Sequence, residues 1–258
     1  MRFKLEIEYN GTNYSGWQIQ KYEKTIQGEL LTVAKKLFET DEVEIYGAGR
    51  TDAGVHALAQ VAHLDVETRL RPDQILTELN KELPHDIHIL SVQPAEAKFH
   101  ARHDAVMRSY IYQISRRRSA FGKKHIWWVR EPMDIKKMYE AAQQLVGFHN
   151  FASFADKNPL EQLSTTVEMR HVDIYEKGDL VIVRVVGSHF LWKMVRRIVG
   201  SLVEVAKGNL EPADLTRFTK EETREPARFT APSAGLFLER IYYKNDKVNR
   251  SLERFLNI

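Results

Sequence analysis

The sequence predicts an α+β protein in which the element order β-α-β-β-α-β occurs twice. Apolar and polar residues alternate over residues 3–9, as in a half-buried strand. Apolar residues recur at helical spacing over residues 26–38, and further strand-like and helix-like stretches follow in a repeated order. A chain of 258 residues with 43% hydrophobic residues is long enough to bury one large or two small cores.

In the first half, a loop over residues 10–24 follows the strand at 3–9. Thr25 is expected to cap the helix that begins at Ile26. A strand at 43–46 leads into a glycine-rich loop, and another strand follows at about 58–66. Pro72 suits the first turn of a second helix, and residues 87–92 complete the unit as a strand.

The second half begins with an alternating strand at 108–115. A helix capped by Asp134 and closed by Gly147 follows it. Strands at 166–175 and 180–186 then form a hairpin, and a long helix spans 190–206. Residues 210–230 hold a short helix after Asp214, and 234–243 is the last strand. Two consecutive units of this order predict a pair of ferredoxin-like halves with antiparallel sheets covered by helices. We place the N-terminal half at 1–104 and the C-terminal half at 105–258.

Composition excludes several classes of protein. The chain has no cysteine, so it has no disulfide, thiolate metal site or cysteine nucleophile. It has no apolar run of about eighteen residues that would span a membrane. The N-terminus alternates like a strand and lacks the apolar core of a signal peptide, so a cytoplasmic location is expected.

The loop Gly47–Ala57 carries the side chains best suited to take part in a reaction. It holds a cation, Arg50, a hydroxyl, Thr51, and a carboxylate, Asp52, among three glycines. A carboxylate can bind metal, act as a base or attack a sugar carbon as in glycosidases, and metal sites usually need more than one acid. A lone Gly-Arg-Asp triplet would favour an ordinary connection between strands that carries solvated charges.

A basic segment lies between residues 116 and 130. The net charge of the chain is only +3, but cations gather here around Trp127 and Trp128, and they are Arg116, Arg117, Arg118, Lys123, Lys124 and Arg130. A basic surface with aromatic residues suits phosphate backbones and exposed bases. A solvated loop is the alternative, and composition alone favours neither.

No motif indicates a cofactor or a metal. Two histidine pairs, His100 with His103 and His56 with His63, lack acids at the spacing of a known metal site, so structural or RNA-contacting roles are favoured. Gly47-x-Gly49 lacks the third glycine of a dinucleotide-binding fingerprint.

Five strings in the same order along the chain closely resemble those of the tRNA pseudouridine synthase A (TruA) family. They are Tyr9–Gln18, Gly47–Ala57, Arg108–Tyr112, His189–Gly200 and Pro232–Leu236. The resemblance implies two ferredoxin-like halves whose sheets lie side by side, with the active site in a central basic cleft. It also implies isomerisation of uridine to pseudouridine at positions 38, 39 or 40 of the tRNA anticodon stem-loop, by a homodimer without cofactor or metal.

The resemblance also assigns roles to residues. Asp52 matches the catalytic aspartate, Arg196 the arginine that pairs with it, and Tyr110 the tyrosine that stacks on the target base. Arg197 is the alternative to Arg196. Without the resemblance, Arg196 would be interpreted as facing solvent and Tyr110 as a core residue. The implied substrate-binding residues are Arg50, Tyr110, Gln18, Val55, His56, Arg116, Arg117, Arg118, Lys123 and Lys124.

Two questions stay open at this point. The route by which Asp52 acts can be attack at C1′, addition to the uracil ring or formation of a glycal. The alternative function is a non-catalytic RNA-binding module on a ferredoxin-like fold, because such sheets bind RNA through surface aromatics. Loss of Asp52 or Tyr110 would favour that alternative, and both are present.

Overall fold

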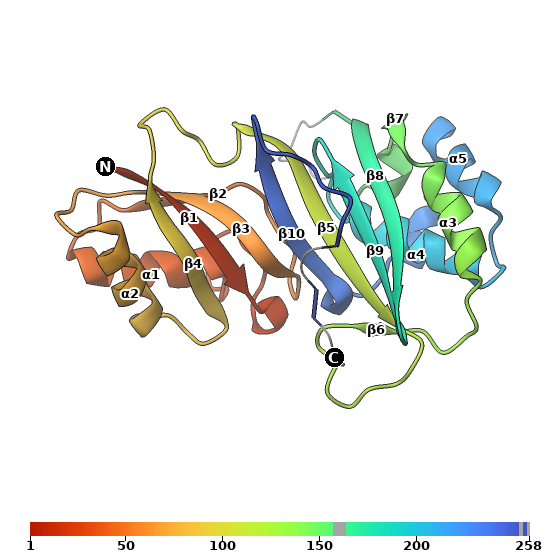
Figure 1. The fold of residues 1–258 in the computed structure, drawn as a ribbon, viewed down its shortest axis with the longest axis horizontal. Helices are drawn as coiled ribbons and strands as arrows, with labels where there is room; N and C mark the ends of the chain where they lie inside the picture. The colour runs from red at the N-terminus through yellow and green to blue at the C-terminus, as the bar shows by residue number, and fades with distance from the viewer. Residues whose placement is uncertain (157–163, 253–254, 257–258) are drawn as a thin grey trace. The chain divides into compact units, whose positions relative to one another are not determined.

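The computed structural model describes residues 1–156, 164–252 and 255–256 (Figure 1). Its helices and strands confirm the α+β class. The chain packs into two compact units, one of Met1–Val106 with Phe237–Lys247 and the other of Met107–Leu236 with Val248–Ile258. The predicted division after residue 104 stays a prediction. The compact units differ from it mainly because the last strand packs with the first unit.

The first unit contains the predicted β-α-β-β-α-β order. Its elements are β1 (Arg2–Tyr9), a 3-10 turn η1 (Gly11–Asn13), α1 (Ile26–Phe38), β2 (Glu44–Gly47), β3 (His56–Asp65), α2 (Pro72–Glu82), β4 (Ile87–Pro94) and β10 (Leu236–Tyr243). Strand β1 lies between β4 and β3 and is antiparallel to both. The other edge of β3 pairs with β2 near residues 62–65 and with β10 near residues 56 and 57.

Local signals set both helix starts of this unit as predicted. The side chain of Thr25 accepts a hydrogen bond from the backbone nitrogen of Gly28 at 3.2 Å, which caps α1. Pro72 is the first residue of α2, where its missing N–H has no intrahelical partner to lose. The two helices contact each other, and α2 packs along β4 (Figure 1).

The second unit is built on β5, which pairs with β9, and the sheet continues through β8 to β7. Its elements are β5 (Ala105–Ser115), β6 (Trp127–Trp128), α3 (Ile135–Gln143), β7 (Gly147–Asn150), η2 (Ala152–Phe154), β8 (Thr166–Lys177), β9 (Leu180–Gly187), α4 (Met194–Ala206), α5 (Pro212–Lys220), η3 (Glu225–Phe229) and η4 (Ser233–Gly235). Helix α3 contacts both α4 and α5, as Figure 1 shows.

The starts of two helices in this unit differ from the prediction. Helix α4 begins at Met194 and not at 190, because Lys193 has a left-handed backbone (φ 61°) that interrupts helical geometry. Helix α5 begins at Pro212, so Asp214 is its third residue, where the carboxylate accepts a hydrogen bond from the nitrogen of Glu211. The short strand β7 was not predicted, since four residues give too short a pattern.

The buried faces follow the alternation of the sequence. Phe3, Leu5, Ile7 and Tyr9 of β1 are all buried, while the residues between them are partly or fully exposed. None of the helices in the described part of the chain is long and apolar enough to cross a membrane.

One histidine is part of the core of the first unit. His63 of β3 is 1% exposed, and its ring stacks on Tyr46 and lies 4.7 Å from the ring of His100. Its Nδ1 accepts a hydrogen bond from the backbone nitrogen of Ala101 at 3.2 Å, which requires an unprotonated nitrogen. Burial, with the nearby charge of Arg2, lowers the pKa of His63 to about 4.

This burial predicts acid-sensitive stability. In the unfolded chain a histidine takes up its proton near pH 6.5, so the unfolded state binds more protons between pH 6.5 and 4 and stability falls through that window. From pH 7 to pH 5 the loss from His63 is about 2 kcal/mol. When the pH falls from 7 to 5, the midpoint of thermal unfolding should therefore decrease by several degrees less in His63→Gln than in wild type. The exposed His88 gives a control, His88→Gln, which should behave as wild type; equal losses in all three proteins would contradict the assignment.

Candidate active site

The loop Gly47–Ala57 connects β2 to β3 and is tied to the strand that follows it. The nitrogen of Ala48 donates to the carbonyl of Val61 at 2.7 Å. The amide of Gln60 spans the loop at Gly49, donating to its carbonyl at 2.8 Å and accepting from its nitrogen at 3.3 Å. Gln60 is fully buried, so these bonds form in a low-dielectric environment where they hold the loop firmly.

The glycines of the loop serve different purposes. Only Gly54 adopts positive φ, 75°, in the turn closed by the hydrogen bond from the nitrogen of Val55 to the carbonyl of Asp52. At Gly47 the constraint is space, because a Cβ there would lie 2.5 Å from the buried ring of Trp17. Gly47 and Gly49 do not adopt positive φ.

The residue before Asp52 is fixed through both its side chain and its main chain. The hydroxyl of Thr51 hydrogen-bonds the hydroxyl of Tyr9 at 2.8 Å in a buried contact. The carbonyl of Thr51 accepts from the nitrogen of Trp17 at 3.0 Å. Asp52 itself is neither fully buried nor fully exposed, so its carboxylate sits on a rigid backbone at the border of the protein interior.

Two glutamines position Arg50, which is exposed. Nε of Arg50 donates to Oε1 of Gln18 at 3.2 Å, and Nε2 of Gln18 donates to Oε1 of Gln27 at 2.8 Å. Gln27 is buried, and its own Nε2 donates to the carbonyl of Ile45, which fixes the orientation of its amide. The predicted residues Gln18 and Arg50 are thus brought together, and Gln27 is a positioning residue that sequence reasoning missed.

Val55 and His56, predicted to bind substrate, are each 1% exposed. Nδ1 of His56 accepts a hydrogen bond from the nitrogen of Gly11 at 3.0 Å, and its ring stacks on Phe237 at 4.6 Å. These contacts hold the loop to its neighbours. A direct contact of either residue with substrate stays a prediction.

Tyr110 lies in β5 of the second unit and is 8% exposed. Its ring meets that of Phe190 edge to face, with the centroids 5.0 Å apart. The neighbouring Tyr112 is fully buried and donates its hydroxyl hydrogen to the carbonyl of Pro232 at 2.7 Å. The two tyrosines of this strand therefore differ in their surroundings.

Arg196 and Arg197 lie in the first turn of α4 but have different partners. Arg197 is buried and engages Asp156, with 3.4 Å between Nη2 and the carboxylate, and its Nη1 donates to the carbonyl of Ala155. Burial lowers the pKa of Arg197 despite this acid. Nε of Arg196 donates to the carbonyl of Ala231. Arg197 is thus committed to a buried pair, which favours Arg196 as the functional cation. Its pairing with Asp52, a residue of the other unit, stays a prediction.

The basic segment after β5 is less uniformly cationic than its sequence suggests. Arg116 pairs with Glu176 at 2.8 Å and Arg117 with Asp179 at 3.2 Å, and both acids come from the β8–β9 hairpin. Arg118 lies over the ring of Trp128 at 5.8 Å. Lys123 and Lys124 are exposed. The predicted phosphate contacts of the segment stay a prediction.

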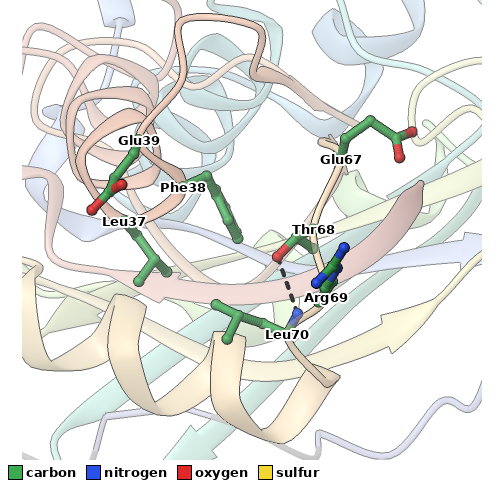
Figure 2. Close-up of a pocket in the computed structure, with 7 residues that line it drawn as sticks. All are labelled: Leu37, Phe38, Glu39, Glu67, Thr68, Arg69 and Leu70. Carbon is green, nitrogen blue, oxygen red and sulfur yellow. Dashed lines mark hydrogen bonds between the residues drawn. The ribbon is translucent and has the colours of Figure 1, made fainter.

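A pocket of about 540 Å³ lies at the end of α1 (Figure 2). It is lined by Leu37, Phe38, Glu39, Glu67, Thr68, Arg69 and Leu70. Its size is that of a small-molecule site, but the lining includes none of the residues predicted to act or bind. Within residues 1–156, 164–252 and 255–256, no group of three or more potential ligands is placed to hold a metal ion.

Comparison with known proteins identifies the class to which this fold and loop belong. The profile of the tRNA pseudouridine synthase family matches residues 6–104 and 141–244, which include Asp52 and Arg196. The chain belongs to this family.

Its similarity to individual relatives extends over nearly the whole chain. The tRNA pseudouridine synthase A of Geobacillus kaustophilus (strain HTA426) is 38% identical over 254 residues, 97% of this chain and 98% of its own. That of Afipia carboxidovorans (strain ATCC 49405 / DSM 1227 / KCTC 32145 / OM5) is 41% identical over 245 residues, 94% of this chain and 99% of its own. The expected family and its isomerase reaction on tRNA uridine are confirmed, whereas the tRNA positions stay a prediction.

The hydroxyl pair under Asp52 generates a test of loop rigidity. Tyr9→Phe leaves the buried hydroxyl of Thr51 without this partner and should cost about 1–2 kcal/mol of unfolding free energy. Thr51→Val should cost a similar amount. The double variant replaces both hydroxyls by apolar groups of similar shape, so it should recover part of the loss. Denaturant unfolding of all four proteins measures this cycle, and strictly additive losses would show that the two hydroxyls are not coupled.

Proposed function

We propose that the protein converts uridine to pseudouridine at position 38, 39 or 40 of the tRNA anticodon stem-loop, with Asp52 as the catalytic carboxylate. The observation that carries the proposal is the support of this carboxylate. Asp52 follows Thr51, whose side chain and carbonyl are both hydrogen-bonded to buried residues, so its backbone is fixed before substrate binds. Catalytic groups that are held in place need no reorganisation during reaction.

The reaction conserves all atoms of the nucleoside. The bond from C1′ to N1 breaks, the uracil turns within the pocket, C5 bonds to C1′, and the proton displaced from C5 is balanced by one gained at N1. Attack at C1′, addition to the uracil ring and the glycal route each use an ionised carboxylate at this point. None of the three consumes an oxidant or reductant.

An ionised carboxylate beneath a nucleobase loses much of its water, so it needs a compensating cation. Arg196 is the proposed cation, because its guanidinium is oriented by Ala231 and is not committed to the pair that occupies Arg197. A guanidinium also offers several donors in a fixed plane, which suits a carboxylate better than a lysine does.

The remaining residues act on the RNA. A base paired in an A-form stem is out of reach, so the target uridine leaves the helix. Arg50, which is exposed and held by Gln18, enters the space that the uridine vacates, and Tyr110 stacks on the uracil base. The segment 116–130 and the loop 10–24 contact phosphates. We further propose a homodimer and a cytoplasmic location, both of which come from the family resemblance.

A non-catalytic RNA-binding module is the weaker alternative. Such a module binds RNA through aromatic residues and has no need of a carboxylate at the position of Asp52. The rigid support of Asp52 also has no purpose in simple binding. Catalysis is therefore the better account of these residues.

The function is tested by mapping pseudouridine in bulk tRNA with and without the protein, and by measuring tritium release from uridine labelled at C5. Wild type should modify positions 38–40. Asp52→Asn should lower the rate at least about 10³-fold, since it removes the reacting group, while RNA affinity stays within a few-fold. Asp41→Asn changes an exposed aspartate and should retain full activity. Tritium release by Asp52→Asn at the wild-type rate would exclude the mechanism.

A second prediction separates the two tyrosines of β5. Tyr110→Phe keeps the stacking ring but removes the hydroxyl, so it should slow the later proton transfer by roughly 10²-fold with little change in RNA affinity. Tyr112→Phe removes a hydrogen bond to Pro232 and should mainly reduce stability, with a severalfold fall in the rate constant at most, because this bond also holds the segment next to Arg196. Single-turnover rates and thermal unfolding measure both effects. Unchanged turnover in Tyr110→Phe would restrict this hydroxyl to packing.

A further inference from the structure

Arg196 and Ala231 make two hydrogen bonds to each other. The nitrogen of Ala231 donates to the carbonyl of Arg196 at 3.1 Å, and Nε of Arg196 donates to the carbonyl of Ala231 at 2.7 Å. One bond fixes the main chain of the arginine and the other fixes its side chain. Ala231 is 1% exposed, so the contact is shielded from competing water.

This contact depends on a close approach between two segments of main chain. Gly200 lies one helical turn beyond Arg196 in α4. A Cβ at Gly200 would be 1.5 Å from the carbonyl oxygen of Phe229 and 3.3 Å from the nitrogen of Ala231. No side chain fits there without displacing the segment 229–231. Glycine inside a helix is unfavourable relative to alanine, so this position carries a cost that close packing explains.

The segment that meets Gly200 is held on both sides of Ala231. The hydroxyl of Thr230 donates to the carbonyl of Ala227 at 2.8 Å, and the carbonyl of Pro232 accepts from the hydroxyl of Tyr112 at 2.7 Å. Its position is therefore set by its own contacts, and the flat surface of α4 at Gly200 lets it reach Arg196.

The direction of the arginine follows from these bonds. Because Nε faces the carbonyl of Ala231, the edge of the guanidinium that carries Nε is occupied, and the end with the two Nη groups holds the other donors. A carboxylate that pairs with Arg196 thus meets the Nη end. A guanidinium free to rotate would present either edge.

We propose that Gly200 is a positioning residue for the reaction, because it admits the segment 229–231 that fixes the direction of the Arg196 guanidinium. The inference rests on the proposed pairing of Arg196 with Asp52. Gly200 itself touches no substrate. Its effect should appear in the chemical step and not in RNA binding.

The test is the single-turnover rate constant with enzyme in excess over tRNA, measured beside the dissociation constant for the same tRNA. Gly200→Ala should lower the rate constant 10-fold or more and change the dissociation constant less than twofold. The matched control is Ser201→Ala, the next residue of the same helix, which is also buried and whose hydroxyl has no hydrogen-bond partner among the described residues. That variant should keep the wild-type rate constant.

A double variant distinguishes positioning from simple damage. Arg196→Lys lacks the planar fork, so adding Gly200→Ala to it should cause little further loss if glycine acts through the arginine. Additive losses, or a wild-type rate constant in folded Gly200→Ala, would overturn the proposal while leaving the proposed function intact. Full activity of Arg196→Lys or Asp52→Asn would instead contradict the proposed function, and with it this inference.

A milder variant keeps the proposal open to refutation if Gly200→Ala does not fold. Thr230→Val removes the hydrogen bond to Ala227 and preserves the shape of the side chain. It loosens the same segment without a steric clash. Thr230→Val should lower the rate constant severalfold when introduced into the wild-type protein and hardly at all when introduced into Arg196→Lys. An unchanged rate constant in the single variant would overturn the proposal.

Discussion

The direct contact between the main chain of the loop Gly47–Ala57 and the segment around Trp17 is the constraint on which the rest of the site depends. Trp17 donates to the carbonyl of Thr51, the nitrogen of Gly54 donates to the carbonyl of Tyr14, and the hydroxyl of Tyr9 holds the side chain of Thr51. A carboxylate on a free loop would lose orientation on every fluctuation. Here the backbone on either side of Asp52 is tied to the core of the first unit, so its position is decided by folding and not by substrate.

The second unit solves a similar problem for a long side chain. An arginine has many rotamers, and its charge is useful only where it points. The guanidinium of Arg197 is occupied by its buried pair with Asp156. The guanidinium of Arg196 is oriented by its hydrogen bond to the carbonyl of Ala231, and the main chain of Arg196 is fixed by the nitrogen of Ala231. Arg197 thus serves the structure, and Arg196 is the arginine proposed to serve the reaction.

Much of the fold could be predicted from the sequence because its signals are local. A cap at Thr25, a proline at 72 and a cap at Asp134 act within one turn, and the structure confirms all three. The start of α4 could not be predicted, because the left-handed backbone of Lys193 is imposed by its surroundings on a residue that does not prefer it.

The candidate site shows the same division. Asp52, Arg50 and Gln18 could be found because they lie in strings that resemble a family. Gln27 could not be found in this way. A polar residue beside the apolar face of a helix indicates no function until its hydrogen bond to the Gln18 amide is known. Ala231 contacts Arg196 through its backbone, so the identity of its side chain gives no indication of this contact.

The path of the chain has a consequence for its synthesis. Strand β10 packs with the first unit, and Phe237 covers the ring of His56 beside the loop. The first unit therefore cannot be completed when residues 1–106 leave the ribosome, because its last strand is made only after residues 107–236, most of the second unit. The nascent chain must hold an unfinished sheet edge through that interval, and the loop Gly47–Ala57 gains its final support among the last events of folding.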